Sequence, residues 1–249
     1  MIKISNVTKY FGAQKVMHGL SLDIPDKKTV VIIGRSGCGK SVLLKHMIGL
    51  LKPDSGKILV KGKDIAKLDD KELDEARKHF GMLFQGAALF DSLTVAENVG
   101  FALTRFTKKS PAEIRKLVKE KLALVGLENV EDKKPAELSG GMKKRVGLAR
   151  AIAMDPEIML YDEPTTGLDP IMSDIINELI VELQKKLKMT SVVVTHDMKS
   201  AYQIGDKIAM MYEGKIIEEG TPKEIQHTKN AVVKQFIKGS AKGPIQVLG

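Results

Sequence analysis

The sequence predicts an α/β protein with a parallel β-sheet, an antiparallel β subdomain and an inserted helical subdomain. Short apolar runs such as "TVVIIG", "IMLYD" and "SVVVT" alternate with helix-periodic segments along much of the 249-residue chain. Such alternation is typical of a parallel sheet with crossover helices. Residues 86–140 interrupt the alternation because they are mostly helical, so we expect them to form a separate subdomain.

The N-terminal region is predicted to be β-structure. Residues 1–33 contain three stretches that are each predicted to be a strand, broken at Gly12, Pro25 and Asp26. They are the alternating "IKISNVT", then "LSLDI" and "TVVIIG". The run "VVIIG" is continuously apolar, as expected for a strand buried on both faces. A helix is predicted from Lys40 until Pro53 ends it, and residues 56–65 form a short strand pair.

The rest of the chain continues the alternation outside the helical insertion. Helices are predicted over residues 69–79, 140–154, 170–188 and 197–204. Strands are predicted over residues 79–85, 158–162 and 191–196, with a strand pair over 207–220. A last helix is predicted over 230–238, where Val232, Val233, Phe236 and Ile237 lie on one stripe. The Gly- and Pro-rich residues beyond it cannot continue that helix.

Composition limits the class of protein. Hydrophobic residues make up 43% of the chain, enough for a substantial core, and one cysteine excludes a disulfide framework. No apolar run is long enough to span a bilayer and no secretory signal is visible, so the cytosol is the default location. The formal charge of +9 suits an anionic partner, either nucleic acid or a membrane surface, or simply a lysine-rich solvated surface.

A phosphate-binding loop is the strongest motif. "GRSGCGKS" matches G-x-x-x-x-G-K-[ST] directly after a predicted strand and at the start of a predicted helix. Backbone N–H groups of such a loop surround nucleotide phosphates, Lys40 holds the β and γ phosphates, and Ser41 ligates Mg²⁺. Cys38 fills a variable position and is not expected to be catalytic. The predicted ATP-binding residues of the loop are Gly34, Arg35, Ser36, Gly37, Cys38, Gly39, Lys40 and Ser41.

Two carboxylates end a buried strand in "IMLYDEP". Asp162 suits the Mg²⁺ coordination sphere, and Glu163 suits a general base that polarises the attacking water. Gln85 follows another strand and could contact Mg²⁺ or the water, so the predicted metal ligands are Ser41, Gln85 and Asp162. His196 ends a third strand and could touch the γ-phosphate. Gln85 and His196, each taken alone, also fit a purely structural role.

A second glycine turn, "LSGGM", lies about 100 residues after the first. Ser139 can cap the helix that begins near Gly140, and a helix cap alone is the simplest interpretation. Met142 takes the place of the Glu or Gln of a capping box, so the free N–H groups stay available to an anion. One nucleotide does not need two such turns. Two chains arranged head to tail could instead enclose two nucleotides, each between one phosphate loop and one "LSGG" turn.

With these motifs in order, residues 1–228 resemble the ATP-binding cassette (ABC) family. The resemblance implies that Leu138–Met142 is the signature motif, with Ser139, Gly140 and Gly141 contacting the ATP of a second copy. It implies that Asp169 in "GLD" lies at the dimer seam, and that an aromatic residue stacks on adenine. Phe11 fits that role best and Tyr10 second, the alternative being an ordinary aromatic residue at a strand end. The sequence departs from the common "LSGGQ" at Met142, which removes a polar contact there.

The resemblance also implies partners. A single cassette without membrane spans resembles a separate ATPase subunit that docks on an integral-membrane permease at the cytoplasmic face of the inner membrane. Two stretches, "MLFQGAALFDSLTVAENV" and "LSGGMKKRVGLARAIAMDPEIMLYDEPTTGLDP", are similar to the ATPases of MCE-linked lipid transporters, the MlaF/Mkl group. That group implies an MCE-domain partner and a lipid substrate.

Other functions stay open at this point. They are an ATPase for another permease such as an amino-acid importer, an ABC protein acting on nucleic acid or the ribosome, and a nucleotide-binding module without turnover. Nucleic acid is not the expected partner, because neither a second cassette nor a coiled-coil insertion is visible. The expected domains are a nucleotide-binding core (1–85 and 141–220), a helical subdomain (86–140), and a C-terminal helix and tail (221–249). Whether the tail packs on its own chain or on a second copy stays open.

Overall fold

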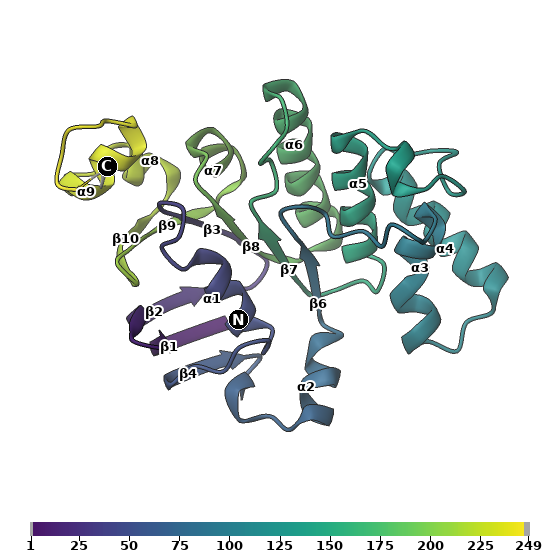
Figure 1. The fold of residues 1–249 in the computed structure, drawn as a ribbon, viewed down its shortest axis with the longest axis horizontal. Helices are drawn as coiled ribbons and strands as arrows, with labels where there is room; N and C mark the ends of the chain where they lie inside the picture. The colour runs from purple at the N-terminus through teal and green to yellow at the C-terminus, as the bar shows by residue number, and fades with distance from the viewer. Residues whose placement is uncertain (1, 247–249) are drawn as a thin grey trace. The chain divides into compact units, whose positions relative to one another are not determined.

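The computed structural model describes residues 2–246, which form two compact units (Figure 1). The first unit takes in the described residues up to Leu73 and again from Val192 onward, and the second is Asp74–Ser191. Within residues 2–246, no helix has both the length and the apolar character needed to cross a membrane.

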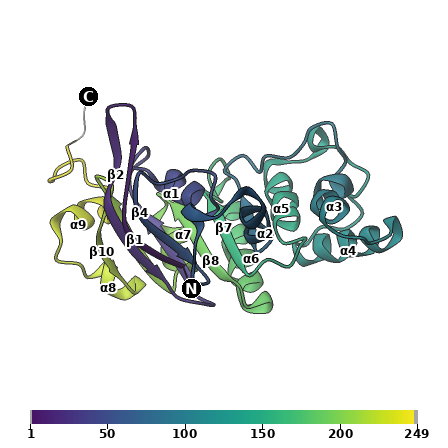
Figure 2. The same cartoon turned by 90° about the horizontal axis from the view of Figure 1, so that it is seen from below.

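The first unit begins with an antiparallel sheet of strand order β2-β1-β4-β5. Figure 1 shows β2, β1 and β4 side by side, and Figure 2 shows the long hairpin of β1 and β2. Its strands are β1 (Ile2–Phe11), β2 (Gln14–Ile24), β4 (Ser55–Val60) and β5 (Lys63–Asp64). Ile2 and Ile4 of β1 are buried and lie opposite Ile24 and Leu22 of β2, which are buried too. Because successive strand residues point to opposite faces, this alternation places the apolar side chains on one face. The expected antiparallel subdomain is confirmed.

A second set of strands in this unit leads to the phosphate-binding loop, which follows β3, and to His196, which follows β8. Their order is β10-β9-β3-β8. The strands are β3 (Thr29–Ile33), β8 (Thr190–Thr195), β9 (Lys207–Tyr212) and β10 (Lys215–Gly220), and the first two residues of β8 belong to the second unit. β3 runs parallel to β9, and all five of its residues are buried, as its unbroken apolar run predicted. α1 (Lys40–Met47) follows β3, and α7 (Met198–Ile204) follows β8 and contacts β3.

Two short helices end the described chain, and one of them was not predicted. α8 (Pro222–Gln226) begins with a capping box between Thr221 and Glu224, with proline at its first position. "TPKE" therefore carried the signal for α8. α9 (Ala231–Lys238) confirms the predicted last helix.

The packing of α9 includes a buried polar residue that the sequence did not predict. Val233 is buried, but Val232, Phe236 and Ile237 are only half-buried, and the polar Gln235 is buried instead. The cause is a clasp that Gln235 forms with the tail. Its Nε2 donates to the carbonyls of Ser240 and Ile245 at 3.2 Å, and its Oε1 accepts from the Ile245 amide at 2.6 Å.

The clasp folds the tail back onto its own unit. Gly243 makes room for it, since a Cβ there would lie 2.4 Å from the Gln235 amide oxygen. Beyond the clasp, Arg35 of the phosphate-binding loop donates to the Gln246 carbonyl at 3.0 Å. In this structure the described part of the tail therefore packs on its own chain.

We expect Gln235→Ala to release this tail. Its loss leaves the buried Ile245 amide without its acceptor, which costs about 1–3 kcal/mol. Because cleavage follows the population of the open form, tryptic cleavage at Lys242 should rise roughly 5- to 100-fold. Mass spectrometry of the digest measures this, and Lys234→Ala, at an exposed position of α9, is the control. Equal cleavage in both variants would show that Gln235 does not hold the tail.

The second unit has a parallel strand pair and a group of helices. β6 (Phe80–Leu83) runs parallel to β7 (Ile158–Asp162). The helices are α2 (Asp70–Arg77), which contains the boundary between the units, α3 (Val95–Phe106), α4 (Pro111–Leu124), α5 (Gly140–Ala151) and α6 (Pro170–Leu187). α3 contacts both α4 and α5 (Figure 1).

Capping determines where the inserted helices begin. Thr94 and Glu97 form a capping box on α3, and Ser110 and Glu113 form one on α4. Residues 86–94 are not helical, although the sequence predicted a mostly helical segment from residue 86. The expected helical subdomain lies wholly inside the second unit, and its expected boundaries at 86 and 140 stay a prediction.

Candidate functional site: a phosphate loop and a signature turn

The phosphate-binding loop joins β3 to α1, as the sequence predicted. Gly37 and Gly39 have positive φ values of 79° and 105°, a backbone region that strongly favours glycine. The Lys40 side chain is 5% exposed, and its ammonium group donates to the carbonyls of Gly34 at 2.8 Å and Arg35 at 3.1 Å. The loop thus holds a buried cation over its own backbone at the start of a helix, an arrangement that fits nucleotide phosphates.

Close packing explains two of the loop glycines. A Cβ at Gly34 would lie 2.4 Å from the Met211 carbonyl of β9. A Cβ at Gly39 would lie 2.9 Å from the Met211 side chain and 3.1 Å from that of Val16 in β2. Both β9 and β2 therefore pack closely against the loop. β2 pairs with β1, which ends in the candidate adenine-stacking residues Tyr10 and Phe11.

Two aromatic rings at the end of β1 are candidates for that stacking. Phe11 and Tyr10 are each 45% exposed. The Lys9 ammonium lies 5.7 Å from the centre of the Phe11 ring, and that of Lys15 lies 5.4 Å from the Tyr10 ring. Exposure does not separate the two rings, so Phe11 stays a prediction.

His196 is exposed at the C-terminal end of β8. The residues on either side fix its backbone. The Asp197 amide donates to the Thr195 hydroxyl at 3.0 Å, and the Asp197 carboxylate accepts from the amides of Lys199 and Ser200 at the start of α7. Such fixed backbone suits a residue that must present its side chain in one place.

In the second unit, β7 leads to the two predicted carboxylates. Asp162 and Glu163 are 8% and 9% exposed. Glu163 has φ +47°, which is strained for a non-glycine residue and persists only where its surroundings hold it. Buried carboxylates at a strand end, one of them strained, are typical of a functional site rather than of a solvated surface.

Lys144 of α5 was not predicted to belong to the site. Its ammonium donates to the Glu163 carbonyl at 3.2 Å and to the Gln85 carbonyl. Burial lowers the pKa of Lys144, while the negative charges of Glu163 and Asp162 act in the opposite direction. One buried cation therefore joins the backbone of Glu163 to that of Gln85, whose side chain is exposed.

The second glycine turn begins α5 as predicted. The Ser139 hydroxyl accepts from the Met142 amide at 3.3 Å, and no capping box forms. Ser139 and Gly140 are exposed. Asp169 caps α6 by accepting from the amides of Ile171 and Met172, each at 3.0 Å.

The two helix starts lie together. A Cβ at Gly141 would lie 2.2 Å from the Met172 side chain, and one at Gly140 would lie 3.7 Å from that of Leu168. The four residues expected to face a second copy therefore occupy one neighbourhood of the second unit.

Comparison with known proteins agrees with these motifs. The model of a family described as "ABC transporter" matches residues 17–166. A "Probable ribonucleotide transport ATP-binding protein mkl" from Mycobacterium leprae is 44% identical over 245 residues, covering 98% of this chain and 70% of that protein. The "Intermembrane phospholipid transport system ATP-binding protein MlaF" from Haemophilus influenzae is 41% identical over 246 residues, covering 99% of this chain and 93% of that protein.

A solved structure is similar too. It is a dimeric ATP-binding cassette in a post-hydrolysis state with ADP and Pi. The TM-score is 0.82 at 35% sequence identity, and the match covers 89% of this chain and 99% of that one.

Proposed function

The chain belongs to the ABC transporter family and is an ATP-binding ATPase subunit, and we propose that it drives a membrane permease for phospholipids or other lipids. The ATPase works as a dimer that encloses two ATP molecules. The observation that supports a permease partner is a groove lined by aromatic side chains, among them Phe84, which precedes Gln85. The observation that favours lipid is the likeness to MlaF along nearly the whole of both chains.

In this proposal each nucleotide is held by one phosphate loop. The Lys40 ammonium turns from the loop carbonyls to the β and γ phosphates, while the loop N–H groups hold phosphate oxygens. Ser41, Gln85 and Asp162 would hold Mg²⁺, whose positive charge, when bound, neutralises charge on the phosphates. Glu163 accepts a proton from the attacking water, and His196 contacts the γ-phosphate.

The second half of each site comes from the other copy. Ser139 and Gly140 are exposed at the start of α5 and Gly141 beside them is buried; backbone N–H groups at such a helix start favour an anion. Asp169 lies in the same neighbourhood and belongs to the seam between the copies. In a two-fold dimer, the signature turn of each copy faces the nucleotide held by the phosphate loop of the other copy. The similar cassette with ADP and Pi is itself dimeric.

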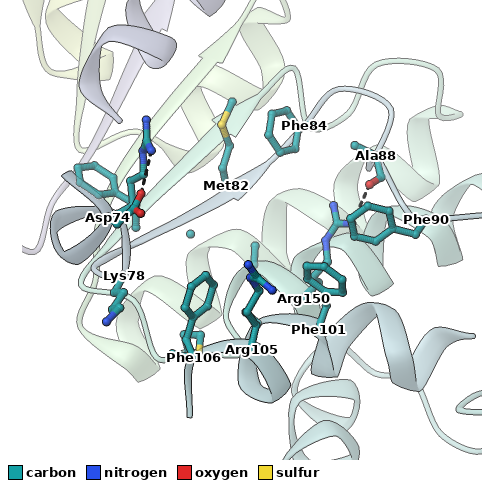
Figure 3. A pocket seen from close by; sticks show the side chains of 16 residues that line it. Asp74, Lys78, Met82, Phe84, Ala88, Phe90, Phe101, Arg105, Phe106 and Arg150 are labelled. Atoms are coloured by element: carbon teal, nitrogen blue, oxygen red, sulfur yellow. Dashed lines mark hydrogen bonds and ion pairs between the residues drawn. The ribbon is translucent and has the colours of Figure 1, made fainter. Parts of the chain in front are cut away.

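A groove of about 540 Å³ in the second unit fits the permease (Figure 3). Phe84, Phe90, Phe101 and Phe106 line it and are 37–52% exposed. Leu89 and Leu93, which flank Phe90 in the sequence, are only half-exposed. The basic side chains along the groove are Arg77, Lys78, Arg105 and Arg150. Exposed rings between cations favour a short permease segment with an apolar face and acidic residues.

The place of work follows from this partner. The subunit binds at the cytoplasmic face of the inner membrane, and the net charge of +9 suits an anionic lipid surface. An MCE-domain protein would be a further component of the same system. The name of the mkl relative points to ribonucleotides instead, so the substrate class needs a direct test.

That test is photocrosslinking from the groove in the native host. A photoreactive residue at position 101 should capture an integral-membrane protein, because Phe101 is 44% exposed inside the groove. The same probe at Leu50, an exposed apolar position of the first unit, should not capture it. Lipid analysis of the purified complex then identifies what travels with it.

Two results would contradict this proposal. Capture of the membrane protein from position 50 but not from position 101 would exclude the groove as the docking site. A complex that carries no lipid, and whose ATPase rate responds to ribonucleotides or amino acids instead, would exclude lipid transport.

A further inference from the structure

The segment after β6 has an unusual backbone. Ala87 and Ala88 are consecutive non-glycine residues with φ values of 60° and 49°. Non-glycine residues rarely adopt this left-handed backbone conformation, and they keep it only where surrounding contacts hold them. The segment, residues 85–88, begins at Gln85, which is predicted to contact the metal or the water, and it leads to Phe90 in the groove.

Side chains of α5 hold this segment by its carbonyl groups. Arg150 Nη2 donates to the Ala87 carbonyl at 2.6 Å, and Nη1 donates to the Ala88 carbonyl at 2.7 Å. Lys144 donates to the Gln85 carbonyl. Gly147 lies midway between the two cations, and a Cβ there would lie 3.1 Å from that of Ala87.

Spacing explains why one helix can do this. Residues 144, 147 and 150 are three apart, so they follow one side of α5. The absence of a side chain at Gly147 lets the segment approach the helix, and the two cations reach its carbonyls on either side. α5 is also the helix that Ser139 caps.

Each cation makes a second contact away from the segment. The Arg150 guanidinium lies 5.9 Å from the centre of the Phe90 ring, which lies 4.9 Å from the Phe101 ring in the groove (Figure 3). Lys144 donates to the Glu163 carbonyl at 3.2 Å. The contacts therefore run without a break from the groove, through Arg150, the segment 85–88 and Lys144, to Glu163.

Lys144 is buried and Arg150 is half-buried. Burial lowers the pKa of Lys144 and of Arg150 below their usual values. Charge-assisted hydrogen bonds are strong, and a desolvated cation that loses its acceptors is left unpaired. The segment is therefore held in one arrangement rather than left to fluctuate.

We propose that Arg150 and Lys144 are positioning residues that transmit the state of the groove to Gln85 and Glu163. The assignment of the groove to a permease rests on the proposed function above. A partner that packs on Phe90 shifts the ring against Arg150. Arg150 then releases or tightens the strained pair, and Lys144 carries the change to the backbone of Glu163.

The first test measures ATP hydrolysis by the isolated subunit. Arg150→Met should lower kcat by roughly ten- to a hundredfold through misplacement of catalytic groups. KM for ATP should change less than about twofold, because the hydrogen bonds of Arg150 go to the Ala87 and Ala88 carbonyls of its own unit. Arg150→Lys keeps the charge but cannot donate to both carbonyls as the planar guanidinium does. Its kcat should therefore lie between that of the unaltered protein and that of Arg150→Met.

The matched control is Arg145→Met on the same helix. Arg145 donates to the Gly126 carbonyl at 3.2 Å, away from the segment. If Arg150 only stabilises the fold, both Met variants lose melting temperature and keep kcat per folded molecule. That result would overturn the proposal, as would a rise in KM without a fall in kcat.

The second test follows the groove itself. The chain has no tryptophan, so Phe90→Trp places a single fluorophore beside Arg150. ATP with Mg²⁺ should change its emission, and Arg150→Met in the same chain should remove that change. If Arg150→Met does not fold, Arg150→Lys should reduce the change by about half. The proposal would be overturned if the tryptophan emission did not change on addition of ATP with Mg²⁺. It would also be overturned if the emission changed equally with and without the Arg150→Met substitution.

Neither readout needs the permease. Failure of both tests would therefore leave the proposed partner standing. Failure of crosslinking at position 101, with Arg150 behaving as expected, would remove the partner and keep the positioning role.

Discussion

Glu163→Gln is expected to keep ATP binding and to lower turnover by about 10²–10⁴-fold. Gln has nearly the same shape but cannot accept a proton from water. The Lys144 contact is to the Glu163 backbone carbonyl, so the substitution leaves it in place. Steady-state ATPase rates and nucleotide affinity measure the effect, and Lys40→Ala should instead weaken binding.

The control for this prediction is Glu182→Gln, at an exposed position of α6. It removes the same charge at a position that is not a predicted site residue, and it should leave the ATPase rate unchanged. Near-normal turnover in Glu163→Gln would remove Glu163 from the role of general base.

Ser139→Arg is expected to abolish hydrolysis, because a long cation would fill the exposed turn that faces the nucleotide of the other copy. Each chain contributes one phosphate loop and one signature turn. A heterodimer of Ser139→Arg with Lys40→Ala therefore keeps at most one intact site, formed by the loop of the first chain and the turn of the second. Its ATPase rate per dimer should be at most about half that of the unaltered protein, by this site count.

Ser110→Arg is the matched control. Ser110 is also an exposed serine that caps a helix of the second unit. Loss of either cap costs about 0.5–2 kcal/mol of stability, but only Ser139 is proposed to face a nucleotide. Equal loss of activity in both variants would mean that the cap, and not a contact in trans, explains the effect.

The sequence predicted most of the fold because local patterns encode it. The unbroken apolar runs became buried strands, and the motif glycines lie where positive φ or close packing requires them. The capping residue Ser139 correctly predicted the start of α5, and the same kind of signal at Ser110 and Thr221 was overlooked.

Features that depend on tertiary contacts were missed. The run "GGMKKRVGLAR" contains several cations that look alike in the sequence, and only the approach of three carbonyls distinguishes Lys144 and Arg150. The burial of Gln235 beside the apolar stripe of α9 was missed for the same reason. Gln235 is buried because the tail returns to it, and helical periodicity cannot reveal a partner ten residues away.

ATP is expected to join two copies of this chain through the phosphate loop of one and the signature turn of the other. The most direct measurement is sedimentation of the Glu163→Gln protein with and without ATP. Slow hydrolysis should preserve the nucleotide between the subunits, so ATP should convert monomer to dimer, and adding Ser139→Arg should prevent this. A chain that stays monomeric with ATP bound, or that hydrolyses ATP at a full specific rate at every protein concentration, would contradict the account.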